Sequence, residues 1–124
     1  MISEFQGESL VWIAQDLQNL DASITTLKKG AYHEALEAAK KSLLSIKSRA
    51  GMFDYLVAAE VAFSFYGFLR NHFEAEKPSH ATIMQKHLDV LKIILARQVT
   101  GNGSDVEREL AEGLKMLTFK LQEA

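Results

Sequence analysis

Histidine is the residue type with the widest chemistry in this sequence, which contains four: His33, His72, His80 and His87. An imidazole can bind a metal ion, transfer a proton near neutral pH or act as a nucleophile. His80 and His87 are seven residues apart, about two helical turns, which is too far for both to bind one ion unaided. We therefore predict no metal site. We expect His33, His72 and His80 to be solvated or to cap helices, and His87 to be partly buried.

Most other catalytic residue sets are absent from the sequence. Cysteine is missing, which excludes disulfides, thiolate zinc ligands and a cysteine nucleophile. Neither a glycine-rich phosphate loop nor the Glu-x-x-His pattern of di-iron bundles occurs. A serine nucleophile needs a base and an oxyanion hole, which helix interiors rarely supply. We therefore predict a protein that is not an enzyme and has no cofactor. The formal net charge of -2 also predicts no nucleic-acid partner.

The elements that position these residues are helices, because apolar residues recur at alternating spacings of three and four. Such a pattern is typical of a bundle seam and does not occur in a strand. The first stripe consists of Leu10, Ile13, Leu17, Leu20, Ile24 and Leu27. The second consists of Tyr32, Leu36, Ala39, Leu43, Ile46 and Ala50. Gly30 separates them, so we expect the first two helices to form an antiparallel hairpin.

Three further helices are predicted after Gly51. The third spans about Asp54 to Phe73, with Asp54 as its N-cap, and is apolar enough to be central or to offer a second face to a partner. The fourth spans about His80 to Gln98 and is capped by Ser79. The fifth begins at a capping box from Ser104 to Glu107, and its stripe consists of Val106, Leu110, Leu114, Leu117 and Leu121.

Composition favours one soluble domain over residues 1–124. Apolar residues make up 48% and charged residues 24% of the chain, an ordinary globular balance. The most apolar stretch, from Tyr55 to Leu69, contains Glu60 and is shorter than the roughly 20 residues that span a bilayer. No signal peptide is evident at Met1. We therefore expect a cytoplasmic protein without a membrane partner.

One residue of the second helix lies off its apolar stripe. At 100° per residue, Leu44 is about 120° from the centre of the stripe. Its neighbours on that side are Lys40, Lys47, Ser48 and Gly51. An apolar side chain among lysines and small residues is a candidate contact point, although single surface leucines are also common.

The stretch from Leu43 to Tyr55 resembles the signature of histidine phosphotransfer (HPt) domains. It is most similar to the version at the N-terminus of the CheA chemotaxis kinases, which reads roughly His-Ser-Ile-Lys-Gly-x-Ala-Gly-Met-Phe-Gly-Tyr. The residues that match in register are Ile46, Lys47, Ala50, Gly51, Met52, Phe53 and Tyr55. The resemblance implies an all-α fold, an antiparallel four-helix bundle of HPt type, here with a fifth helix. It also implies a place in a bacterial two-component phosphorelay.

The departures from this signature concern the chemistry. The position of the phosphorylated histidine is occupied by Leu44, which has no nitrogen to phosphorylate. The position of the glutamate that orients the imidazole in the family is occupied by Tyr66. Ser48 and Asp54 replace two glycines, and an N-cap role would explain Asp54. Lys47, which faces the phosphoryl group in the family, is retained.

The resemblance and its departures together imply binding without phosphotransfer. We expect a response-regulator receiver domain or a histidine kinase to dock on the second and third helices. Leu44 would be the anchor, and Tyr66 would fit it apolarly. Lys40 and Lys47 would steer an acidic partner, while Ser48 and Gly51 would permit close approach.

Three alternatives stay open from the sequence. The chain could be an active phosphotransferase that uses another histidine. It could instead be a structural homo-oligomer, such as a homodimer, in which Phe65, Phe68 and their neighbours pair with a second copy. Binding of a small ligand inside the bundle ranks last, because the apolar stripes supply no polar residues for it.

Overall fold

The computed structural model describes residues 4–29, 33–74, 77–97, 101 and 105–122. Within that part of the chain it contains five α-helices and no β-strand, which confirms the all-helical prediction. The helices are α1 (Glu4–Lys28), α2 (His33–Met52), α3 (Leu56–Asn71), α4 (Pro78–Ala96) and α5 (Asp105–Gln122).

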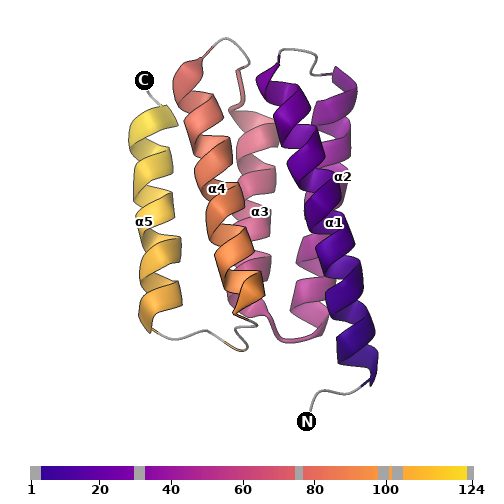
Figure 1. Cartoon of the computed structure of the whole chain (residues 1–124). Coiled ribbons are helices and arrows are strands. Elements are labelled where there is room, and N and C mark those ends of the chain that lie inside the picture. The colour runs from indigo at the N-terminus through magenta and orange to yellow at the C-terminus, as the bar shows by residue number, and fades with distance from the viewer. Residues whose placement is uncertain (1–3, 30–32, 75–76, 98–100, 102–104, 123–124) are drawn as a thin grey trace.

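The first four helices contact one another in a ring. Helix α1 packs on α2 and α4, and α3 packs on the same two helices. Helix α5 packs on α4 and, less extensively, on α3. Figure 1 shows successive helices running in opposite directions, with α5 (yellow) at one edge of the molecule.

The predicted stripes of α1 and α2 contribute to a core that also contains residues of α3, α4 and α5. On α1, Ile13, Leu20 and Ile24 are fully buried, and on α2 the same is true of Leu43 and Ile46. Spacings of three and four return each of these side chains to one face of its helix, so the face can be buried along its length. Tyr32, which was predicted to begin the second stripe, lies outside the described residues.

The connection from α2 to α3 is a Schellman turn, and the predicted N-cap role of Asp54 is wrong. The Tyr55 amide donates to the Ala50 carbonyl at 2.8 Å, and the Asp54 amide donates to the Gly51 carbonyl at 3.4 Å. Asp54 has a left-handed φ of 66°, while the N-cap of α3 is Tyr55 and has no side-chain cap. Asp54 therefore ends α2 in a backbone conformation that glycine adopts most easily.

Helix α4 begins before the predicted Ser79 cap. Its N-cap is Lys77 and its first residue is Pro78, whose fixed φ suits the start of a helix. Ser79 lies inside the helix, and its buried hydroxyl oxygen has no hydrogen-bond partner among the described residues. The predicted last residue, Gln98, lies outside the described residues.

Helix α5 is attached by ion pairs as well as by apolar packing. Glu60 of α3 accepts hydrogen bonds from Arg108 and from Lys115 of α5, each at 3.0 Å. The buried carboxylate of Glu107 pairs with Arg97 at 3.0 Å. Val106 is exposed, so its predicted place in the buried stripe is wrong. Ser104 of the predicted capping box lies outside the described residues.

The histidines divide into two exposed and two buried residues. His33 and His72 are exposed, as expected. The predictions that His80 is solvated or capping and His87 only partly buried are wrong, because both rings pack in the core against Phe68. His80 Nδ1 accepts a hydrogen bond from the Glu74 amide at 2.9 Å, and thereby closes the α3–α4 turn.

Candidate functional site

The outer side of α2 presents the residues that were singled out from the sequence. Leu44 is 40% exposed, whereas its neighbour Leu43 is fully buried. The prediction that Leu44 points outward is therefore confirmed. We use the name α2/α3 face for the surface that these residues of α2 form together with neighbouring residues of α3. Its α2 part consists of Lys40, Leu44, Lys47, Ser48 and Gly51.

Helix α3 contributes an aromatic pair to the α2/α3 face. Phe63 is 53% exposed, and its ring stacks on that of the half-buried Tyr66, with centroids 6.3 Å apart and planes 18° from parallel. The Lys47 ammonium lies 4.4 Å from the centroid of the Phe63 ring. Because α2 and α3 are antiparallel (Figure 1), this contact places Tyr66, three residues after Phe63, at the level of Leu44.

The two lysines of the face differ in their partners. Lys40 forms an ion pair with Glu37 one turn earlier, at 2.8 Å. This hydrogen bond, together with the charge of Lys40, lowers the pKa of the exposed Glu37 carboxyl below its ordinary value. Among the described residues Lys47 has no carboxylate within ion-pair distance, and the Phe63 ring is its only aromatic partner. Lys47 is therefore the cation of this face that remains available to an acidic partner.

Small residues follow Leu44 along the same side of α2. Ser48 and Gly51 are both exposed. A Cβ atom added to Gly51 would meet no heavy atom within 4 Å, so the fold itself does not require glycine there. The absence of a side chain at Gly51 keeps this end of the face low enough for another molecule to approach closely.

Phe63 is the member of the face that sequence reasoning missed. The sequence predicts an apolar third helix as a whole and does not single out Phe63. A signal was nevertheless present, because Phe63 lies two positions, or about 200°, from both Val61 and Phe65, which are buried. A residue so far from the buried stripe belongs on the opposite side of its helix.

Phe65 and Phe68 are unsuitable for the homo-oligomer that was considered from the sequence. Both are buried, with Phe65 completely inaccessible to solvent. The Phe68 ring packs in the core against His80 and His87. These two residues therefore cannot form an interface with a second copy of the folded chain.

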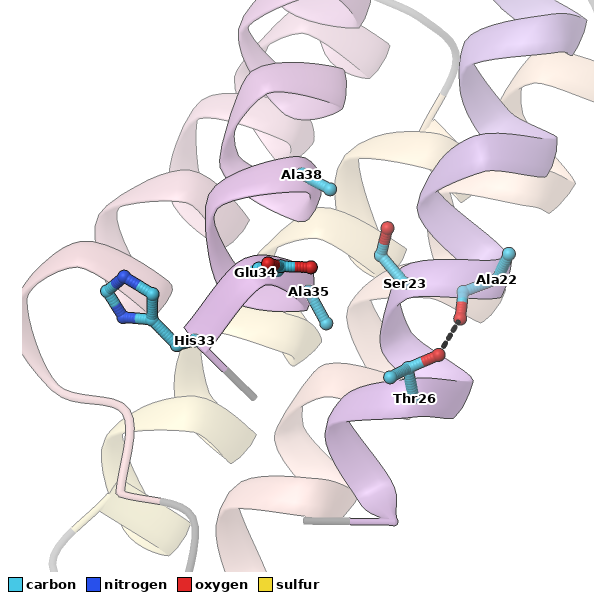
Figure 2. Close-up of a pocket in the computed structure, with 7 residues that line it drawn as sticks. All are labelled: Ala22, Ser23, Thr26, His33, Glu34, Ala35 and Ala38. Carbon is cyan, nitrogen blue, oxygen red and sulfur yellow. Dashed lines mark hydrogen bonds between the residues drawn. The ribbon is translucent and has the colours of Figure 1, made fainter. Parts of the chain in front are cut away.

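A groove lies between α1 and α2, on the side where His33 begins α2. It is lined by Ala22, Ser23, Thr26, His33, Glu34, Ala35 and Ala38 (Figure 2). The Thr26 hydroxyl donates to the Ala22 carbonyl of its own helix at 3.1 Å. Figure 2 shows the His33 ring turned away from α1, so the groove does not bring histidine and hydroxyl groups together. Five of the seven lining side chains are those of alanine, serine or threonine.

The structure shows neither a metal cluster nor a membrane span in the residues it describes. No three His, Asp or Glu side chains there are grouped so that they could hold a metal ion. None of the described helices is both long enough and apolar enough to cross a bilayer.

Comparisons with protein-family models, with curated proteins and with solved structures found no match to this chain.

Proposed function

We propose that this protein is a degenerate HPt-like module that binds a receiver domain or a histidine kinase of a two-component pathway and cannot carry a phosphoryl group. The observation that carries the proposal is the exposed Leu44, which occupies the signature position of the phosphorylated histidine. A hydrocarbon side chain in that place retains a surface for contact and removes the nucleophile.

The proposal includes the architecture of the fold. The ring of contacts among α1, α2, α3 and α4 is what an antiparallel four-helix bundle of HPt type requires, with α5 as an additional helix on α3 and α4. In such a bundle the phosphoacceptor position faces solvent in the middle of a helix. Leu44 meets this requirement, since it lies near the middle of α2 and is exposed.

The composition of the α2/α3 face supports binding to a protein with an acidic rim. Its centre is apolar, with Leu44 and Phe63 exposed and Tyr66 half-buried. Its edge carries the cations Lys40 and Lys47. An apolar centre with a charged edge is the usual anatomy of a protein interface, in which the centre supplies affinity and the edge steers association.

The alternative of a relocated phosphoacceptor receives no support from the positions of the histidines. His80 and His87 are buried in the core, where a partner's phosphoryl group does not reach them. His72 is the C-cap residue of α3, and His33 is the first residue of α2. Neither lies in mid-helix with small residues beside it, as an HPt phosphoacceptor does.

Binding to purified receiver domains tests the proposed function. The receivers of the organism that encodes this chain are titrated by calorimetry into the wild type, into Leu44→Asp and into Met116→Asp. Met116 is an exposed apolar residue of α5, outside the α2/α3 face, and is the matched control. We expect one receiver to bind the wild type and the control equally, and to bind Leu44→Asp at least about tenfold more weakly.

A phosphotransfer assay tests whether this protein can accept a phosphoryl group from the receiver. The binding receiver is phosphorylated with labelled acetyl phosphate, which releases acetate, and is then incubated with this protein. We expect the label to stay on the receiver. Appearance of acid-labile label on this chain would overturn the proposal in favour of an active phosphotransferase, and equal binding by wild type and Leu44→Asp would show that the face is not used.

A further inference from the structure

The Lys47–Phe63 contact couples a charge to an apolar surface within the α2/α3 face. The lysine ammonium lies 4.4 Å from the centroid of a ring that is itself about half exposed. In the free protein this side chain therefore covers part of the Phe63 ring. Cation–π contacts at exposed sites are weak, so a carboxylate brought close to Lys47 competes effectively with the ring.

We propose that the Lys47 side chain covers a second apolar anchor, Phe63, and leaves it when a negative charge approaches. The partner surface then carries a carboxylate next to an apolar side chain. The carboxylate draws the Lys47 ammonium off the ring, and the apolar side chain then contacts the uncovered part of Phe63. This inference rests on the proposed function and specifies the chemistry of the partner that the face selects.

Lys47 is the cation suited to this role because the other lysine of the face is already engaged. Lys40 pairs with Glu37 at 2.8 Å within α2. A partner carboxylate would have to displace Glu37 before it could gain Lys40. Lys47 faces no such competitor among the described residues, because it rests on a ring that carries no formal charge. Binding therefore depends more strongly on Lys47 than on Lys40.

Release of the cover also gives the face selectivity. An apolar partner without a carboxylate leaves Lys47 on Phe63 and gains Leu44 alone as an anchor. An acidic partner without an apolar group gains the charge and leaves the ring facing water. Only a surface with both groups side by side gains both contacts, which is specificity through linked requirements.

A double-mutant cycle on the receiver that binds the wild type tests this inference. The variants are Lys47→Met, Phe63→Leu and the double variant, with Lys40→Met as the matched control. Methionine keeps an apolar chain over the ring and removes the charge. We expect Lys47→Met to weaken binding about tenfold and Lys40→Met less than about threefold. We also expect Phe63→Leu to weaken binding severalfold in the wild type and hardly at all in the Lys47→Met background.

Proton NMR of the Lys47 side chain reports the cover directly. In the free protein we expect the ε-methylene protons to be shifted upfield by the Phe63 ring, and in the complex we expect that shift to disappear. A persistent upfield shift in the complex, or independent effects of the two substitutions, would overturn the cover while leaving the proposed function intact. Failure of the wild type to bind any receiver would overturn both.

Discussion

Leu43 and Leu44 are adjacent in α2 and have opposite environments: Leu43 is fully buried in the core, and Leu44 is 40% exposed on the α2/α3 face. Consecutive helical residues are separated by 100°, which is enough to move a side chain from the interior to the surface. The same residue type therefore serves packing at one position and is available for recognition at the next.

This contrast predicts opposite effects on stability for two leucine substitutions. Leu44→Asp should change the free energy of unfolding by no more than about 0.5 kcal/mol, as is usual at the surface. Leu43→Ala should lower it by about 2–5 kcal/mol, because it removes buried methyl groups and leaves a cavity. Urea denaturation followed by circular dichroism measures both. A large loss of stability in Leu44→Asp would show that Leu44 contributes to the core.

The buried ring of His87 predicts destabilisation in acid. Burial lowers the pKa of His87 from 6.5 to about 4, although the hydrogen bond between Nδ1 and the Ile83 carbonyl at 2.9 Å opposes the shift. Above pH 6.5 the ring is neutral in both states and its contribution to stability is complete. As the pH falls from 6.5 to about 4, the unfolded chain takes up a proton that the folded chain does not, so stability is lost.

The expected loss from His87 is about 3 kcal/mol over that range, at 1.36 kcal/mol for each unit of pKa shift. Urea denaturation at several pH values from 7.5 down to 4 measures it in the wild type and in His87→Leu, in which this part of the acid sensitivity should be missing. His72→Gln, which alters an exposed histidine, is the control and should retain it. Equal pH dependence in all three proteins would contradict the assignment.

The ion pairs of Glu60 lead us to predict that this residue stabilises the packing of α5 on α3. It accepts hydrogen bonds from two cations of α5, Arg108 and Lys115, and the bond from Lys115 raises the pKa of that ammonium. Glu60→Gln should therefore speed amide hydrogen exchange in α5, with a loss of about 1 kcal/mol in local stability, while exchange in α1 and α2 stays unchanged.

Glu112→Gln is the matched control for Glu60. Glu112 is also paired with Lys115, at 3.6 Å, but belongs to α5 itself and makes no attachment to α3. Its substitution should leave exchange in α5 nearly unaltered, since exposed ion pairs within one helix contribute little. Similar exchange in both variants would show that apolar packing alone holds α5 in place.

The left-handed backbone of Asp54 predicts that glycine stabilises the α2–α3 turn. With φ at 66°, Asp54→Gly should raise the free energy of unfolding by about 0.5–1 kcal/mol, because glycine adopts this conformation without steric cost. Asp89→Gly, within α4, is the same substitution at a helical position and should lower stability by a similar amount. Thermal unfolding compares the two, and destabilisation by both would contradict the role of the turn.

The sequence by itself determined the helices of this protein and the orientation of Leu44. Spacings of three and four leave little choice of secondary structure, and they place each residue on a known side of its helix because the helical repeat is fixed. That reasoning correctly separated Leu43 from Leu44. It erred at Asp54, because an aspartate ahead of an apolar run suits both an N-cap and a left-handed helix terminus, and the hydrogen bonds of Tyr55 decide between them.

The tertiary structure alone decided which side chains from different helices meet. The contact of Lys47 with Phe63 depends on the packing of α2 against α3, and the burial of His80 and His87 depends on the aromatic side chains of α3. The attachment of α5 through Glu60 joins this residue to Arg108 and Lys115, which follow it in the sequence by 48 and 55 positions. Periodicity assigns a residue to a face of its own helix, whereas the partner of that face is set by how all the helices pack together.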